Sequence, residues 1–463
     1  MTSRDIIWIT LESVRQDHTS LSQHDRDTTP TLQRLAERAD GASFSNCFSH
    51  GIWTRTSSAS ILTGRAPADH SVLSFDSKLP KSVATVPEQL SDSGYRTACV
   101  SPIAQVSEAT GLDRGFDDFH YLSRGTLLDE AGLLTVLRFL RNIRRHSAGL
   151  TTDTKKHCTG YLVTEIAKRH IRRTRQNSDP LFLYTHIGDS HHAYYPPKGW
   201  QDVFADDLKL PLDEALDVVM DMSDELINNI ANGAQFTDNE WNAIEVLYDT
   251  CIRYVDHLAG EIVDTARTHL ENPIIVITAD HGELFGEQGC LAHMLVANTA
   301  VSNVPLVISG IDDLESSESL VQHTDALQLI TEVCDLDIPI PAGTDIRSAE
   351  RTATVTQRGG KRAQKKLQQI QEHNPTFDAS QFHWDDLTSL RTTDYRYQCS
   401  DDREELFELP DETTNRSNHQ PSMTDEFRQL AEEWLIEHRG SSEKEQAEFS
   451  EQMQQQLKDL GYL

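Results

Sequence analysis

Residues 274–283 read Ile274-Ile-Val-Ile-Thr-Ala-Asp280-His281-Gly282-Glu283. The unbroken apolar run is typical of a strand that is buried on both faces of a parallel sheet. Such a strand brings Asp280 and His281 to the carboxyl edge of the sheet, where α/β proteins bind their ligands, and Gly282 permits a tight turn there. A carboxylate and an imidazole at this edge predict a site for a divalent cation, although an aspartate in this position could equally cap the next helix.

Similar apolar runs recur along the chain and alternate with helical patterns. This alternation predicts a doubly wound α/β fold with a mostly parallel central sheet. A threonine followed by a proline, Thr29-Pro30, predicts the cap and first position of one helix, and the capping box Thr237-Asp-Asn-Glu240 predicts the start of another. The predicted strands are Ile6–Leu11, Arg96–Val100, Leu181–Ile187, Ile274–Thr278 and Pro305–Ser309, and the predicted helices are Pro30–Ala39, Thr237–Leu270 and His323–Cys334.

The character of the sequence changes after about Ala342. We expect a catalytic α/β domain over residues 1–345, a smaller α+β subdomain over residues 346–440, and an acidic, Gln-rich tail over residues 441–463. The polar, locally basic stretch at residues 359–371 is read as a helix or a mobile loop. Within the subdomain, the predicted elements are short strands at Tyr395–Cys399 and Leu406–Leu409 and a closing helix at Asp425–His438.

The chain is strongly acidic, with 73 acidic against 42 basic residues and a formal net charge of -31. Such an excess is typical of a solvated coat of the kind halophile proteins carry, and a cationic partner or a metal store is the alternative reading. It argues against a nucleic-acid binder, which needs a basic surface. The seven cysteines are scattered and odd in number, and we find no signal peptide or membrane-spanning stretch, so the sequence predicts a cytoplasmic protein.

Two further segments point to the same sheet edge as Asp280. The strand Ile6–Leu11 ends at Glu12, whose carboxylate can meet the same cation if the two strands are neighbours. The segment from Gly51 to Pro67 places Thr54 at the expected N-terminus of a helix, where the helix dipole and free N–H groups favour an anion. A threonine hydroxyl whose proton is displaced by a cation is an activated nucleophile, whereas taken alone Thr54 reads as a helix cap.

Together these segments resemble the sulfatase and alkaline phosphatase superfamily. The resemblance runs nearly from end to end of the chain. It implies an alkaline-phosphatase-like three-layer sandwich and a metal-dependent hydrolase acting on ester bonds. The matching motifs are Arg15-Gln-Asp-His18, Thr28 to Ala36, Leu62-Thr-Gly-Arg65, Gly94-Tyr-Arg-Thr97, Gly115-Phe-Asp117, Asp189-Ser-His-His-Ala-Tyr-Tyr-Pro-Pro197, Thr278 to Glu283, Val304-Pro-Leu306 and the closing Leu460-Gly-Tyr-Leu463.

The chain departs from the main sulfatase type at the nucleophile. Those enzymes convert the first residue of Cys-x-Pro-Ser-Arg to formylglycine, and in the same frame this chain has Thr54-Arg-Thr-Ser-Ser58. The convertible residue, the proline and the arginine are all missing, so we expect no formylglycine. Thr54, with Glu12 in place of the usual aspartate and Ser13 in place of a second one, resembles the threonine-nucleophile branch of the superfamily, which includes phosphodiesterases and phosphoglycerol transferases.

The resemblance implies roles for particular residues. Glu12, Thr54, Asp280 and His281 would hold one divalent ion, with Mn²⁺ or Zn²⁺ favoured and Mg²⁺ or Ca²⁺ possible. Thr54, His191 and His293 would be catalytic, the two histidines also contacting the transferred group. Arg55 is either a clamp for an anionic oxygen or a side chain that points to solvent. His186, His192 and His323 are expected to be satisfied or surface histidines, and Asp325 is expected to cap the helix it opens.

Three functions remain open at this point. The first is hydrolysis of a sulfate or phosphate ester of a small molecule or glycan through a covalent Thr54 intermediate. Phosphate esters are favoured, because a sulfated threonine lacks the aldehyde exit of formylglycine whereas water can attack the phosphorus of a phosphothreonine. The second is a phosphoglycerol-type transferase, and the third is a degenerate binding protein of the same fold. Oligomeric state and the natural substrate are not encoded in any recognisable motif.

Overall fold

The computed structural model describes residues 4–174, 179–401, 403–440 and 445–459, so the closing motif at residues 460–463 lies outside the described residues. A seven-stranded sheet in the order β2-β12-β8-β1-β7-β5-β6 forms the centre of the molecule. Its strands are β2 (Gly41–Ser43), β12 (Leu306–Ser309), β8 (Ile274–Ala279), β1 (Ile6–Leu11), β7 (Leu181–Ile187), β5 (Arg96–Ser101) and β6 (Asp118–Tyr121).

Five neighbouring strands of this sheet, from β8 to β6, run parallel to one another. The strand predicted at residues 305–309 does not join them: β12 is antiparallel to both β8 and β2. A parallel return needs a crossover that spans the sheet, usually a helix. Between β8 and β12 the described chain has only small elements, β9 (Leu284–Phe285), a 3-10 turn (Glu287–Gly289), β10 (Leu291–Ala292), α12 (Thr299–Ser302) and β11 (Asn303–Val304), so it returns beside β8 in the opposite direction.

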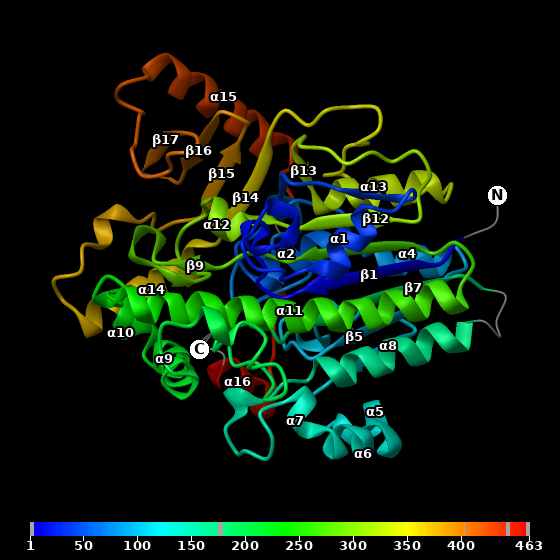
Figure 1. Ribbon diagram of the computed structural model, residues 1–463. Helices are drawn as coiled ribbons and strands as arrows, with labels where there is room; N and C mark the ends of the chain where they lie inside the picture. The colour runs from blue at the N-terminus through cyan, green and yellow to red at the C-terminus, as the bar shows by residue number, and fades with distance from the viewer. Residues whose placement is uncertain (1–3, 175–178, 402, 441–444, 460–463) are drawn as a thin grey trace.

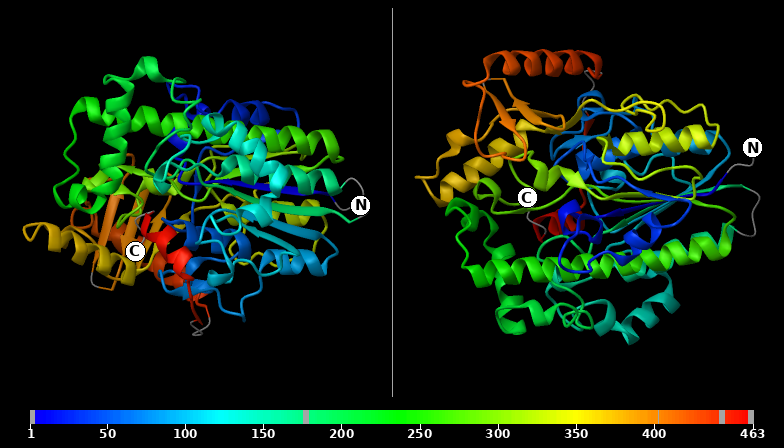
Figure 2. Two further views of the ribbon diagram at one scale, coloured as in Figure 1. Left: turned by 90° about the horizontal axis from the view of Figure 1, so that it is seen from below. Right: turned by 45° about the horizontal axis from the view of Figure 1, so that its top comes forward.

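Helices cover both faces of the sheet, which confirms the predicted three-layer α/β fold (Figures 1 and 2). The long helix α11 crosses the molecule in Figure 1, and its first turn has the capping box expected of Thr237 and Glu240. One layer holds α1 (Pro30–Ala36), α8 (Gly160–Thr174) and α11 (Asp238–His269), and the other holds α2 (Thr54–Thr63), α4 (Val86–Asp92) and α13 (His323–Val333).

Helix α1 begins at Pro30 as predicted, and Thr29 stands at its N-cap position, but the Thr29 side chain makes no capping hydrogen bond. The Thr29 hydroxyl accepts a hydrogen bond from the Ser20 N–H instead of one from its own helix. The free N–H groups at the start of α1 donate to the buried carboxylate of Asp256 on α11, at 3.0 Å from Thr31 and 3.2 Å from Leu32. A tertiary contact therefore replaces the local cap.

The C-terminal region adds an antiparallel sheet of β14 (Thr354–Arg358), β15 (Leu387–Arg391), β16 (Tyr395–Cys399) and β17 (Glu404–Glu408). Helix α15 (Pro421–Glu437) packs on this sheet around a small core that includes Tyr397 and Phe427. The basic stretch forms a helix, α14 (Gly360–His373), whose Leu367 and Ile370 belong to the core of the main body. The α+β character of this region agrees with the prediction, and α14 ties it to the α/β layers.

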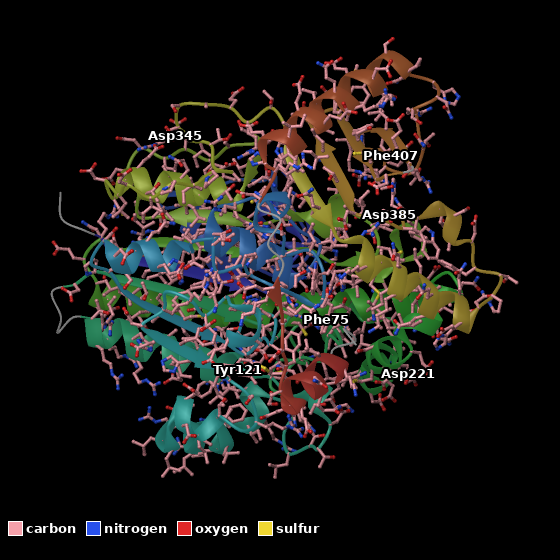
Figure 3. All side chains as sticks on the ribbon, turned by 180° about the vertical axis from the view of Figure 1, so that it is seen from behind. Phe75, Tyr121, Asp221, Asp345, Asp385 and Phe407 are labelled. Atoms are coloured by element: carbon pink, nitrogen blue, oxygen red, sulfur yellow. The ribbon has the colours of Figure 1, made fainter. Side chains whose placement is uncertain are left out.

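The chain segment near the C-terminus packs on the body. Strand β18 (Glu445–Gln446) pairs antiparallel with β4 (Ser77–Lys78), and helix α16 (Glu451–Asp459) lies beside Phe75 and Tyr121 in the view of Figure 3. Among the described residues no helix is both long and apolar enough to cross a bilayer. The remaining elements are β3 (Cys47–Phe48), β13 (Val321–Gln322), α3 (Pro67–His70), α5 (Leu127–Ala131), α6 (Leu133–Arg141), α7 (Ile143–His146), α9 (Leu212–Asp224) and α10 (Leu226–Ala231).

Candidate metal centre and active site

The register of β1 places two acidic side chains next to each other. Leu11, the last residue of β1, pairs with Ile187 of β7 on one side and with Ala279 of β8 on the other. The ladder continues one step further, because the Glu12 N–H donates to the Ile187 carbonyl at 3.0 Å and the Asp280 N–H donates to the Leu11 carbonyl at 3.3 Å. Glu12 and Asp280 therefore lie at the same level, at the carboxyl end of the parallel strands.

Helix α2 brings Thr54 to this edge as its first residue. The Thr54 hydroxyl donates to Glu12 Oε1 at 2.7 Å and lies 3.4 Å from His281 Nε2. Ser57, one turn further along, donates from its hydroxyl to the Asp280 carbonyl at 2.5 Å and anchors the helix to the end of β8. All ten residues of α2 are buried, so the start of this helix is held rigidly against the strand ends.

His281 completes the predicted set. Its Nε2 lies 3.4 Å from Asp280 Oδ2 and 3.6 Å from Glu12 Oε1. Its Nδ1 lies 2.8 Å from the Gly282 carbonyl, which can only accept, so Nδ1 donates there and Nε2 is the ring nitrogen that faces the carboxylates. The structure thus brings Glu12, Thr54, Asp280 and His281 together at one buried point, although their role as ligands remains a prediction.

His186, expected to be either a satisfied or a surface histidine, is not at the surface. It is fully buried on β7 with Nε2 only 2.6 Å from Glu12 Oε2 and 3.8 Å from Asp280 Oδ2. An ionisable side chain inside an otherwise apolar strand needs a buried partner, and this was the available signal. His192 and His323 are buried as well: His192 Nδ1 lies 3.2 Å from the Ser223 hydroxyl, and His323 bonds through Nε2 to Thr278 and Ala279, while its Nδ1 has no hydrogen-bond partner among the described residues.

The side chains at this point fit a divalent cation. Within the described part of the chain, Glu12 Oε2, Asp280 Oδ2 and His186 Nε2 are buried without a hydrogen-bond partner of acceptable geometry. Buried polar atoms normally have a partner, and several that face one another are explained by an ion that they share. Carboxylate oxygens, a hydroxyl and imidazole nitrogens are suitable donors for such an ion.

A second group of similar composition, His18, His24 and Asp249, has a different character. The Asp249 carboxylate lies 2.7 Å from each histidine and also accepts from the Arg26 guanidinium at 2.6 Å. The guanidinium already supplies the positive charge that a metal would bring, and its own charge repels a cation. We read this group as an ion-pair network that fixes the loop before α1 to α11.

The electrostatics of the first site reflect its buried carboxylates. Burial raises the pKa of Glu12, but the charges of His186 and His281 outweigh it and hold that pKa well below its usual range. The pKa of Asp280 is raised, by burial first and then by the nearby Glu12 charge. Burial lowers the pKa of His281, but Asp280 and Glu12 outweigh it and raise the pKa to about 9. Without a metal, protonated imidazole neutralises the two carboxylates.

The two predicted catalytic histidines lie beside this centre. The rings of His293 and His281 are 4.5 Å apart between centroids, and the His191 ring is 5.2 Å from His293. His293 Nδ1 lies 3.1 Å from Glu283 Oε1. Burial raises the pKa of Glu283 to about 8, while burial and the charge of His281 lower the pKa of His293 well below its usual range. At neutral pH Glu283 is therefore protonated and donates to a neutral His293, which leaves the proton of the imidazole on Nε2.

One of the two expectations for Arg55 was a side chain that points to solvent, and this expectation is wrong. Its side chain is fully buried, donates to Gln105 at 2.7 Å and to the carbonyls of Phe75 and Ser77, and lies over the Trp53 ring. The other expectation, a clamp on the substrate, stays a prediction, and the bonds that hold the guanidinium to the loop around residue 75 do not favour it.

Two cations that the sequence reading missed come from helix α14. The Arg362 guanidinium lies 4.6 Å from the centre of the Trp53 ring and donates to the His293 carbonyl at 3.4 Å. Lys366, one turn later, is buried, and burial together with the Arg362 charge lowers its pKa to about 7. These residues bring positive charge to the histidine side of the centre, more than 300 positions after Glu12.

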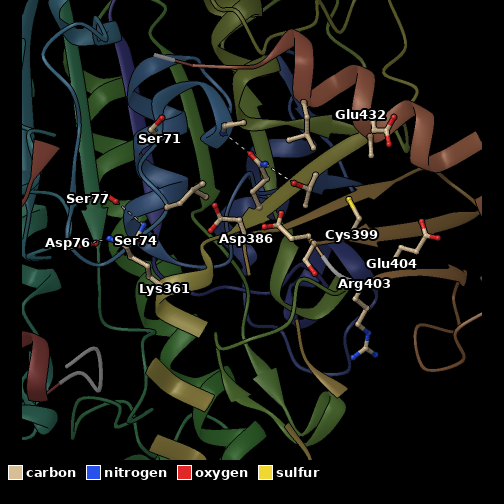
Figure 4. A pocket seen from close by; sticks show the side chains of 18 of the residues that line it. Ser71, Ser74, Asp76, Ser77, Lys361, Asp386, Cys399, Arg403, Glu404 and Glu432 are labelled. Atoms are coloured by element: carbon tan, nitrogen blue, oxygen red, sulfur yellow. Dashed lines mark hydrogen bonds and ion pairs between the residues drawn. The ribbon is translucent and has the colours of Figure 1, made fainter. Parts of the chain in front are cut away.

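A cleft lies elsewhere, between the segment around residues 68–80 and the C-terminal sheet (Figure 4). It has a volume of about 900 Å³ and a mixed polar lining that includes Ser74, Lys361 and Arg403. The described residues that line it include none of the buried cluster around Glu12. The cleft is therefore a separate feature from the cluster at the strand ends.

The sulfatase family profile matches residues 4–336. A sulfatase of Formosa agariphila is 22% identical over 342 residues, which is 66% of this chain. The chain spans about 64% of the length of the curated relatives that it matches.

Solved structures share the fold over almost the whole chain. The phosphonate monoester hydrolase of Agrobacterium radiobacter has a TM-score of 0.72 at 17% identity and covers 94% of this chain and 96% of its own. A putative sulfatase of Bacteroides fragilis has a TM-score of 0.67 at 16% identity, with 95% and 96% covered. With the family profile over residues 4–336 and these shared folds, the chain belongs to the sulfatase family.

Proposed function

We propose that the protein hydrolyses sulfate or phosphate esters at one divalent-metal centre, with Thr54 as the nucleophile and phosphate esters favoured. The single observation that supports this most strongly is the contact of 2.7 Å between the Thr54 hydroxyl and Glu12 Oε1 at the start of a buried helix. A serine or threonine hydroxyl becomes a nucleophile when a neighbouring group takes its proton, and here a carboxylate lies within hydrogen-bonding distance.

The proposed ligands are Glu12, Thr54, Asp280 and His281, with Mn²⁺ or Zn²⁺ favoured and Mg²⁺ or Ca²⁺ possible. When bound, the cation would lower the pKa of the Thr54 hydroxyl and draw negative charge from the ester. Glu12 accepts the proton of Thr54 at Oε1. The start of α2, the positive end of its helix dipole, lies at the same strand ends and favours the anionic group that Thr54 receives.

His191 and His293 are proposed to bind the transferred group. His293 is positioned by Glu283 and presents its Nε2 proton, so it can donate to an ester oxygen without a change of charge. His191 lies beside it with Nδ1 2.7 Å from the His192 carbonyl, so in the imidazolium form its Nε2–H can donate to an ester oxygen or protonate the leaving group. Arg362, bonded to the His293 carbonyl, adds a positive charge on this side of the centre.

The identity of the nucleophile favours phosphorus over sulfur. Thr54 stands where formylglycine stands in the main sulfatase type, so a sulfated threonine would have no aldehyde to re-form. A phosphothreonine can be opened by attack of water at phosphorus, which restores the hydroxyl and releases phosphate. Phosphonate monoester hydrolases among the structural neighbours act at phosphorus on this fold, which is consistent with the proposal.

A cytoplasmic location is proposed from the state of the cysteines. All seven are free thiols, five of them buried, which suits a reducing interior such as the cytoplasm. Cell fractionation with antibody detection would test this, and recovery of the protein in an oxidising compartment would contradict it.

The function is tested by removing metal with a chelator and restoring single metals. The reconstituted protein is assayed on an aryl sulfate, a phosphate monoester and a phosphodiester, beside Thr54→Ala. We expect metal-dependent turnover, faster on a phosphate ester than on the sulfate, and lost in Thr54→Ala. Turnover that survives in Thr54→Ala would contradict the nucleophile. Metal binding without turnover of any ester would favour a binding protein of the same fold, and transfer of the group to an added alcohol in preference to water would favour a transferase.

A further inference from the structure

His186 is the buried polar group at the centre that the predicted ligand set does not use. We propose that His186 is an additional metal ligand through Nε2, so that the centre has two imidazole nitrogens and selects a transition-metal dication over Mg²⁺ or Ca²⁺. This inference rests on the proposed function, since it assumes that the cluster around Glu12 and Asp280 binds a metal. It names the class of metal that the site takes.

The backbone directs His186 to this position. On β7 His186 pairs with Thr10 of β1, two residues before Glu12. Its backbone is therefore close to the carboxyl ends of the strands, and its side chain extends toward Glu12. Its Nε2 lies 2.6 Å from Glu12 Oε2 and 3.8 Å from Asp280 Oδ2. These three atoms are close enough to one another to bind one ion.

The short contact with Glu12 is not a well-formed hydrogen bond. Within the described residues, neither His186 Nε2 nor Glu12 Oε2 has a hydrogen-bond partner of acceptable geometry, despite the 2.6 Å between them. A histidine that served only to orient Glu12 would direct its N–H along the line to the carboxylate. Together with Asp280 Oδ2, the two atoms are instead spaced as ligands of one ion can be.

The contact made by His186 Nδ1 leaves Nε2 available to bind a metal. His186 Nδ1 faces the Tyr184 hydroxyl at 3.4 Å, the limit of a hydrogen bond, on the same strand. A ligating histidine normally bonds through its second nitrogen to a neighbouring group, which fixes the ring. Tyr184 is fully buried and stands two residues away on the same face of β7, so it can serve as this partner.

A second imidazole changes the preference of the site. Mg²⁺ and Ca²⁺ prefer shells made of oxygen, whereas Mn²⁺ and especially Zn²⁺ accept imidazole nitrogen. With His281 and His186, two of the five protein side chains that would contact the ion supply nitrogen. Loss of His186 should therefore weaken binding of Zn²⁺ or Mn²⁺ more than binding of Mg²⁺.

Pulsed EPR of the Mn²⁺-loaded full chain counts the nitrogens that are bonded directly to the ion, and it does not depend on activity. The variants are His186→Gln and His281→Gln, with His323→Gln as a matched buried histidine that bonds to Thr278 and Ala279 outside the cluster. We expect two coupled nitrogens in the wild type and in His323→Gln, and one in each of the other variants. Isothermal titration should show that His186→Gln lowers the ratio of Mn²⁺ affinity to Mg²⁺ affinity by about tenfold or more.

The outcomes separate this inference from the proposed function. One nitrogen in the wild type, lost in His281→Gln and retained in His186→Gln, would overturn the role of His186 and leave the metal centre in place. No bound Mn²⁺ or Zn²⁺ in the folded wild type would overturn both. If His186→Gln does not fold by circular dichroism, the wild-type count decides, since a single nitrogen contradicts a second imidazole ligand.

Discussion

Thr54 and Glu12 meet through a hydrogen bond of 2.7 Å although 42 positions separate them and they lie on different elements, a helix start and a strand end. Glu12 Oε1 receives the Thr54 hydroxyl, while Oε2 lies beside His186. One carboxylate thus contacts both the proposed nucleophile and the additional histidine. The negative charge of Glu12 is therefore central to the site.

Glu12→Gln keeps the shape of the side chain and removes its charge. Loss of a partner that only orients a ligand costs about 10–100-fold in metal affinity, so loss of a ligand should cost about 100-fold or more. Isothermal titration with Mn²⁺ and Zn²⁺ measures this, with the exposed Glu271→Gln as the control. Wild-type affinity in Glu12→Gln would exclude this carboxylate from the metal site.

Metal affinity should rise with pH. The pKa of His281 in the metal-free protein is about 9, so at neutral pH a proton occupies the nitrogen that the metal requires. Between about pH 6.5 and 9 the affinity should rise by up to tenfold per pH unit as this proton is lost. Titration at several pH values in two buffers of different ionisation enthalpy also counts the released protons. An affinity that is flat over this range would contradict the raised pKa of His281.

The raised pKa of His281 also affects the folding stability of the metal-free protein, and its contribution falls as the pH rises. A histidine whose folded-state pKa is raised stabilises the metal-free protein fully below its unfolded pKa of about 6.5, and this contribution is lost as the pH rises through about 9. The difference in unfolding free energy between wild type and His281→Gln, both free of metal, should therefore shrink from pH 6 to pH 9. Urea denaturation measures it, and a difference that grows over this range would contradict the assignment.

Arg362→Met should reduce turnover without releasing the metal. A charge-assisted hydrogen bond contributes about 1.5–3 kcal/mol, so kcat/KM should fall by about 10–100-fold on whichever ester is turned over, with little change in metal affinity. Lys361→Met, the neighbouring exposed cation on α14 that pairs with Asp76, is the matched control. An equal effect of both substitutions would show that only the general charge of this helix matters.

Thr237→Ala should destabilise the fold without touching the chemistry. The Thr237 side chain accepts from the Glu240 N–H at the start of α11, and such a cap contributes about 1 kcal/mol. Urea denaturation should show a loss of this size with unchanged kcat. Thr265→Ala, whose hydroxyl bonds only to the Glu261 carbonyl within the same helix, is the control, and a loss as large as that of Thr237→Ala would show that the cap is not the cause.

Much of the fold could be read from local sequence because its signals are local. Strands β1 and β7 coincide with their predicted bounds, since short runs rich in apolar residues are typical of a sheet covered on both faces. The direction of β12 could not be read, because burial on both faces produces the same apolar run in either direction. The cap of α1 was equally hidden, as Asp256 lies on a helix more than 200 residues later.

The site residues also divide into those that the sequence identifies and those that only the tertiary structure identifies. Asp280 and His281 could be found because they follow a strand directly, and Glu12 and Thr54 could be found because their positions match a family pattern. His186 lies inside an apolar strand, and only the pairing of β7 with β1 shows that it reaches Glu12. Arg362 reaches the site through the packing of α14 on the main body, a long-range contact that no spacing in the sequence encodes.

The role of Thr54 as a covalent nucleophile can be measured directly. The metal-loaded protein is mixed with an ester that it turns over, quenched with acid at short times and digested, and the peptide that contains Thr54 is weighed by mass spectrometry. We expect one transferred phosphoryl or sulfuryl group on Thr54 in the wild type, and a kcat lower by about 10³-fold or more in Thr54→Ala. An unmodified Thr54 peptide at every quench time, together with wild-type turnover in Thr54→Ala, would contradict it.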